Sequence, residues 1–70
     1  MYKINGNVID VYVIIRRGFS NDVILRNYTK DEVKCLGCFK SEDKAVEKRN
    51  EVKRIIEFIG GENLWLKNND

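Results

Sequence analysis

The sequence predicts an α+β fold in which one amphipathic helix packs on one face of a mostly antiparallel sheet of about five short strands, in the order β-β-β-β-α-β. Three observations lead to this prediction. Several segments before residue 40 alternate apolar and polar residues, an Asn-Gly pair marks a tight hairpin, and the segment after Ser41 has helical periodicity. Seventy residues allow one domain, expected over 1–66, followed by a polar C-terminal tail over 67–70.

Asn5-Gly6 separates the first two predicted strands, at 2–4 and about 8–16, because both residues tolerate the positive φ angles of a type I′ turn. A third strand is expected at 23–28. One face of the long strand is wholly apolar and is expected to be core; it comprises Ile9, Val11, Val13 and Ile15. The opposite face of the sheet is expected to present Tyr12, Ile14, Tyr28 and, from the last strand, Trp65.

The stretch from 29 to 39 fits two structures. Thr29 and Glu32 have the spacing of a capping box and Gly37 could end a short helix, but the alternation of apolar residues favours a strand. A clear helix follows, capped by Ser41 and ended by Gly60-Gly61. Its predicted sheet-facing stripe is Ala45, Val52, Ile55, Ile56 and Ile59, with Val46 at the edge, Lys48 and Arg49 within it near its N-terminal end, and Phe58 pointing away. A final strand is expected at 63–67.

The composition argues against an enzyme and against a resident cofactor. The chain has no histidine, so neither a Ser-His-Asp type of triad nor a His-ligated metal site can form within it. It also lacks a glycine-rich dinucleotide loop and a phosphate loop. The longest apolar stretch, at 11–15, is far too short for a membrane helix, and no signal peptide is recognisable. A cytoplasmic protein without a membrane partner is expected.

Cys35-Leu36-Gly37-Cys38 is the one motif with intrinsic chemistry. On a regular strand its two thiols face opposite sides, so a direct disulfide is not expected unless the chain turns at Gly37 or is helical there. Two thiolates are also too few for a closed zinc site, although two chains could share four. The favoured interpretation is two ordinary small apolar cysteines; a zinc-linked dimer and a redox-sensing pair remain as alternatives.

The face opposite the helix is the predicted binding site. Its expected anchors are Tyr12, Arg16, Arg26, Tyr28 and Trp65, because interfaces concentrate their energy in aromatic and arginine side chains. A contiguous apolar patch there predicts a partner protein or a homodimer. The same aromatic and arginine side chains could instead stack bases and hold phosphates of single-stranded nucleic acid. The net charge of only +2 makes that alternative the weaker one.

The segment Cys38-Phe39-Lys40-Ser41-Glu42-Asp43-Lys44-Ala45, preceded by the strand Val11-Tyr12-Val13-Ile14, resembles short bacteriophage and prophage proteins. In those proteins a strand ending in Phe leads to Ser and acidic residues that open a helix. The resemblance covers residues 8 to 59 and transfers no functional residue. It implies a non-enzymatic accessory protein that inhibits or modulates a host protein in the host cytoplasm, in host takeover or counter-defence.

Overall fold

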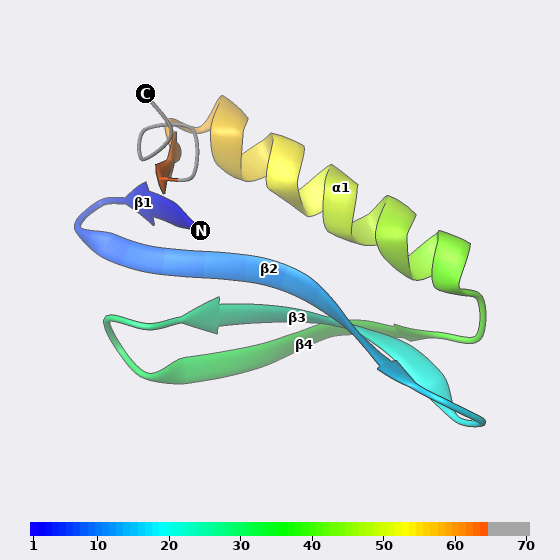
Figure 1. Cartoon of the computed structure of the whole chain (residues 1–70). Coiled ribbons are helices and arrows are strands. Elements are labelled where there is room, and N and C mark those ends of the chain that lie inside the picture. The colour runs from blue at the N-terminus through cyan, green and yellow to red at the C-terminus, as the bar shows by residue number, and fades with distance from the viewer. Residues whose placement is uncertain (65–70) are drawn as a thin grey trace.

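The structure of this chain is a computed structural model that describes residues 1–64. These residues form five strands and one helix in the order β-β-β-β-α-β, which confirms the predicted α+β fold. The strands make one sheet in the spatial order β4-β3-β2-β1-β5, and every neighbouring pair is antiparallel. The helix covers one face of this sheet (Figure 1). The helix-free face is called the open face below.

The first hairpin joins β1 (Tyr2–Ile4) to β2 (Asn7–Arg16). Asn5 and Gly6 have φ angles of 51° and 79°, the two positive values that a type I′ turn requires, so the predicted turn is confirmed. Because β1 is short, its pairing with β2 ends at Ile9. The rest of that edge of β2 must satisfy its backbone groups in another way.

The second hairpin joins β2 to β3 (Ser20–Asn27), which begins earlier than the predicted start at residue 23. Asn21 and Asp22 look like turn residues in the sequence, yet both are buried within the strand. The Asn21 side-chain amide donates to the carbonyl oxygens of Phe39 and Lys40, each at 3.3 Å. Such side-chain pairing is what allows a polar residue to lie in a buried strand.

The stretch from 29 to 39 forms β4 (Glu32–Phe39), so the strand is confirmed over the alternative short helix. Thr29 does not cap a helix; its hydroxyl accepts a hydrogen bond from the Val8 backbone N–H at 2.9 Å. β4 is irregular near its middle. Val23 on β3 pairs with Gly37, whereas Ile24 pairs with Cys35, which leaves Leu36 as the extra residue of a β-bulge.

The helix α1 (Glu42–Phe58) begins after Ser41, whose side chain accepts from the Lys44 backbone N–H at 3.4 Å. β4 is one edge of the sheet and β5 (Glu62–Asn63) is the other, so α1 must cross the whole face to connect them (Figure 1). β5 overlaps the start of the predicted final strand, and residues 65–67 of that prediction lie outside the described residues.

The core lies between α1 and the sheet. Its buried apolar side chains are Tyr2, Val11, Val23, Ala45 and Ile56, with Ile9, Val13, Leu25, Leu36, Phe39 and Val52 packed against them. Phe58 points away from the sheet, as predicted.

Three residues predicted to be core are exposed instead. Ile55 on α1 and Ile59 at its C-cap are 52% and 61% exposed. The contact line of the helix runs through 45, 49, 52 and 56, and Ile55 is turned about 100° from Ile56. Ile15 is 54% exposed. It lies near the tip of the β2–β3 hairpin, which bends away from the helix in Figure 1.

Candidate functional site on the open face

The strand pairing places four of the five predicted anchors on the open face. Val11 and Val23 face the helix, and neighbouring strand residues point to opposite sides, so Tyr12, Arg16 and Arg26 face away from it. Tyr28 faces the same side, because it lies two residues after Arg26 and its N–H donates to the Val8 carbonyl at 2.8 Å, which extends the pairing of β2 with β3. The fifth anchor, Trp65, lies outside the described residues.

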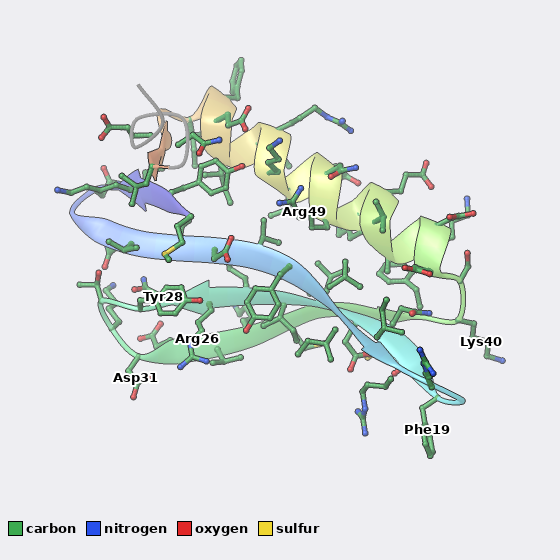
Figure 2. The ribbon with its side chains drawn as sticks, viewed as in Figure 1. Phe19, Arg26, Tyr28, Asp31, Lys40 and Arg49 are labelled. Atoms are coloured by element: carbon green, nitrogen blue, oxygen red, sulfur yellow. The ribbon has the colours of Figure 1, made fainter. Side chains whose placement is uncertain are left out.

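Arg26 and Tyr28 form the centre of a compact cluster, shown with Asp31 in Figure 2. The Arg26 guanidinium carbon lies 5.1 Å from the centroid of the Tyr28 ring, within cation-π range. Val33 pairs directly with Arg26 across β3 and β4 and is 60% exposed, while Tyr28 is 45% exposed. We call Arg26, Tyr28 and Val33 the Arg26 cluster.

The positive charge of Arg26 is poorly balanced within the described residues. Its closest carboxylate is that of Asp31, at 4.0 Å, and the Asp31 side chain is 92% exposed, so solvent screens this pair. Asp10 lies opposite Arg26, but its carboxylate accepts from the Val11 backbone N–H at 2.9 Å and lies 3.8 Å from the N-terminal ammonium. The Arg26 Nε atom is buried, and no atom of residues 1–64 accepts a hydrogen bond from it.

Tyr12 and Arg16 do not join the Arg26 cluster. Tyr12 is half-buried and pairs with Ile24, which is only 8% exposed although it lies on the open face. Arg16 lies towards the other end of the sheet, where its guanidinium is 3.6 Å from the Asp22 carboxylate. The Ser20 hydroxyl donates to that carboxylate at 2.7 Å and, together with the Cys38 thiol and Arg16, lowers the pKa of Asp22.

The two cysteines lie together, which corrects the prediction that their side chains face opposite sides. The bulge at Leu36 adds one residue between them, so Cys35 pairs with Ile24 and Cys38 with Asp22, both on the open face. The two Sγ atoms are 3.8 Å apart, and both side chains are exposed. No alternation pattern reveals such a bulge, although Gly37 beside it was a signal that the strand could be irregular.

A second group of side chains, which the sequence did not single out, surrounds the tip of the β2–β3 hairpin. A hollow of about 430 Å³ there is lined by Arg16, Arg17, Phe19 and Lys40, together with Ile15, Gly18, Ser20 and Asn21. The Phe19 ring is 80% exposed and points out from the tip (Figure 2). No carboxylate among residues 1–64 forms an ion pair with Arg17 or Lys40.

No protein-family model, curated protein or solved structure matches this chain. Within residues 1–64, no group of three or more His, Cys, Asp or Glu side chains could hold a metal ion. The helix in this part of the chain is not long and apolar enough to cross a bilayer. The open face and the hairpin tip are therefore the features from which a function can be argued.

Proposed function

We propose that this chain is a non-enzymatic protein-binding module that docks on a partner protein through the Arg26 cluster of the open face and modulates that partner by covering its surface. The observation that carries the proposal is that the Arg26 guanidinium lacks a closely placed carboxylate within residues 1–64. The Arg26 side chain is 39% exposed and the Asp31 carboxylate lies 4.0 Å away in solvent, so a carboxylate from outside the chain could accept from the exposed part of the guanidinium with better geometry than Asp31 does.

The exposed apolar surface beside Arg26 defines the chemistry of the partner. Tyr28 and Val33 flank the guanidinium and offer apolar contact area, while Arg26 offers a charge. A complementary surface carries an Asp or Glu next to apolar side chains. Arginine and tyrosine are among the residues that most often dominate binding energy in such interfaces.

The available chemistry favours binding over catalysis. The sequence has no histidine. Hydrogen bonding to the Asp22 carboxylate and to Cys35 raises the pKa of Cys38 to about 11, so this thiol is a poor nucleophile at neutral pH. The resemblance to short phage and prophage proteins adds the setting of the proposal, in which the partner is a host protein and binding inhibits or redirects it in the host cytoplasm.

The test is an affinity capture from bacterial lysate with three tagged versions of the full chain, each treated with nuclease. We expect a protein partner to be retained by the wild type and by the control Arg54→Ala/Phe58→Ala, which changes one arginine and one exposed aromatic on the helix. Retention should fall about 30-fold or more with Arg26→Ala/Tyr28→Ala. Equal retention by all three would refute the open face as the docking site.

Sedimentation of the same three proteins identifies whether the occupant is a second copy of the chain. A monomeric wild type, together with capture that depends on Arg26 and Tyr28, supports a different protein as partner. A dimer that the Arg26→Ala/Tyr28→Ala variant abolishes would instead assign the open face to self-association, the homodimer that the sequence predicts, and overturn the proposed partner.

The hairpin tip favours a second candidate function, the binding of single-stranded nucleic acid. Arg17 and Lys40 supply cations without an internal partner in the described chain, and the exposed Phe19 ring can stack on a base. Each ring has an arginine over it, since the Arg26 guanidinium lies 5.1 Å from the Tyr28 centroid and the Arg16 guanidinium lies 6.0 Å from the Phe19 centroid. Phe19, however, is 80% exposed and Tyr28 only 45%, so more of the Phe19 ring is open to a base. The structure thus favours the tip over the face that the sequence predicted for this role.

Binding of a fluorescent single-stranded oligonucleotide at increasing salt tests this second function. Arg17→Ala/Lys40→Ala should weaken binding. It should also make the slope of log K against the log of the salt concentration shallower by about 0.7 for each phosphate that the variant no longer neutralises. Lys44→Ala/Arg54→Ala removes the same charge from the helix and should leave the salt dependence unchanged. Binding that is absent, or that both variants weaken equally, would eliminate a specific nucleic-acid site at the tip.

A further inference from the structure

Cys35 and Cys38 form the strongest chemical feature that the proposed function does not use. Their Sγ atoms are 3.8 Å apart, and a disulfide needs about 2.05 Å, so a small rotation of the two side chains brings them into bonding range. Their partners on β3, Ile24 and Asp22, are two residues apart, which corresponds to about 6.7 Å along a strand. Disulfides occur at Cα separations of about 4.4–6.8 Å, so the backbone spacing also suits closure.

We propose that Cys35 and Cys38 are a reversible disulfide site on the open face, oxidised by a low-molecular-weight disulfide such as oxidised glutathione. Both thiols are exposed, so an oxidant can reach them. In a reducing compartment the pair stays as two thiols and closes on exposure to oxidant. This inference does not rest on the proposed docking function, because it concerns the two sulfur atoms alone.

The reaction balances in two exchange steps. The Cys35 thiolate attacks one sulfur of the oxidant, whose S–S bond breaks and releases one thiol after protonation, leaving a mixed disulfide on Cys35. Cys38 then loses its proton and attacks the Cys35 sulfur, and the second oxidant thiol leaves. The protein loses two electrons and two protons, and the oxidant is reduced to two thiols.

The contact between Asp22 and Cys38 indicates which of the two thiols reacts first with the oxidant. Cys38 lies opposite Asp22 in the pairing of β3 with β4, and interaction with that carboxylate raises the pKa of Cys38 to about 11 and keeps this thiol protonated. Cys38 is therefore the slow, resolving thiol, and Cys35 is the one that meets the oxidant first. The proton that Cys38 loses in the second step passes to solvent, because a carboxylate whose pKa is lowered is too weak a base to hold it.

The experiment incubates the reduced full chain with defined ratios of reduced and oxidised glutathione, quenches free thiols with an alkylating reagent and measures intact mass. We expect the wild type to lose the mass of two hydrogens and to resist alkylation, and a dithiol reductant should reverse both changes. Cys38→Ser should stop at a glutathione adduct on Cys35, and Cys35→Ser should form its adduct more slowly. A wild type that ends only as glutathione adducts or as disulfide-linked dimers would overturn the site.

A pair of variants at Asp22 and Ser20 tests the order. Returning the pKa of Cys38 from about 11 towards its ordinary 9.0 increases the fraction of thiolate by up to about 100-fold. The less basic thiolate is also a weaker nucleophile, so the net gain in the rate of its attack is up to about tenfold. Asp22→Asn should therefore speed ring closure up to about tenfold, whereas Ser20→Ala keeps the carboxylate beside Cys38 and should not. Closure that is equally fast in both variants and the wild type would refute the role of Asp22, and circular dichroism checks that each variant is folded.

Discussion

The Nε atom of Arg49 on the helix donates a hydrogen bond to the backbone carbonyl oxygen of Val11 in β2, at 3.2 Å. Figure 2 shows Arg49 between α1 and β2. β1 stops pairing at Ile9, so Val11 lies on a stretch of edge that β1 does not cover. The Val11 N–H is satisfied by the Asp10 carboxylate, and its carbonyl is satisfied by Arg49. Two side chains thus replace the hydrogen bonds that a longer β1 would have made.

Replacing Arg49 with Met should destabilise the fold by about 1–3 kcal/mol. The substitution keeps an apolar stem of similar length but leaves the Val11 carbonyl, beside a fully buried side chain, without its donor. The measurement is the free energy of unfolding from urea denaturation.

Arg54→Met is the matched control, because Arg54 is exposed on the same helix. Its free energy of unfolding should stay within about 0.5 kcal/mol of the wild type. Equal losses in the two variants would mean that the helix, rather than the contact with Val11, is sensitive to the change.

Local patterns predicted most of the fold because each element carries its own signal. The positive φ angles at Asn5 and Gly6 and the cap at Ser41 depend on a few neighbouring residues, and these features are confirmed. The errors arise where distant segments decide. Burial of Asn21 depends on carbonyl oxygens about twenty residues away, and exposure of Ile55 depends on how the helix is rotated on the sheet.

The candidate site was predicted in the same uneven way. Alternation along the strands correctly places Tyr12, Arg26 and Tyr28 on one face. Strand alternation alone cannot indicate that Arg26 stacks on Tyr28 and leaves its Nε unpaired, because that depends on rotamers. It also cannot reveal the bulge that brings Cys35 and Cys38 together. One extra residue in a strand moves every later side chain to the opposite face of the sheet.

Two neighbouring isoleucines on α1 provide a direct test of how the helix is rotated. Ile56 is 6% exposed and belongs to the core, whereas Ile55 is 52% exposed. Ile56→Ala should cost about 2–4 kcal/mol, because it removes buried methyl groups and leaves a cavity. Ile55→Ala should cost less than about 1 kcal/mol. Urea denaturation of both variants gives the comparison, and a larger loss for Ile55→Ala would show that the stripe predicted from the sequence is the buried one.

Tyr2 should make the stability of the fold depend on alkaline pH. Its ring is 3% exposed, and its hydroxyl donates to the Glu57 carboxylate at 3.3 Å. Burial, followed by the charge and hydrogen bond of Glu57, raises the pKa of Tyr2 above its ordinary 10.0. The unfolded chain therefore loses this proton at a lower pH than the folded chain does.

The stability that this shift contributes is complete below about pH 10 and is lost as the pH rises through the pKa of the folded state. Tyr2→Phe keeps the ring and removes the ionising hydroxyl, so at neutral pH it should cost about 0.5–1.5 kcal/mol, the net worth of one hydrogen bond. We expect the free energy of unfolding of the wild type to fall more steeply than that of Tyr2→Phe between about pH 9 and about pH 11. Lysines titrate in the same range in both proteins, so the difference between the two curves isolates Tyr2. Parallel curves would mean that the phenol ionises alike in the folded and unfolded chains, and that Glu57 does not hold its proton.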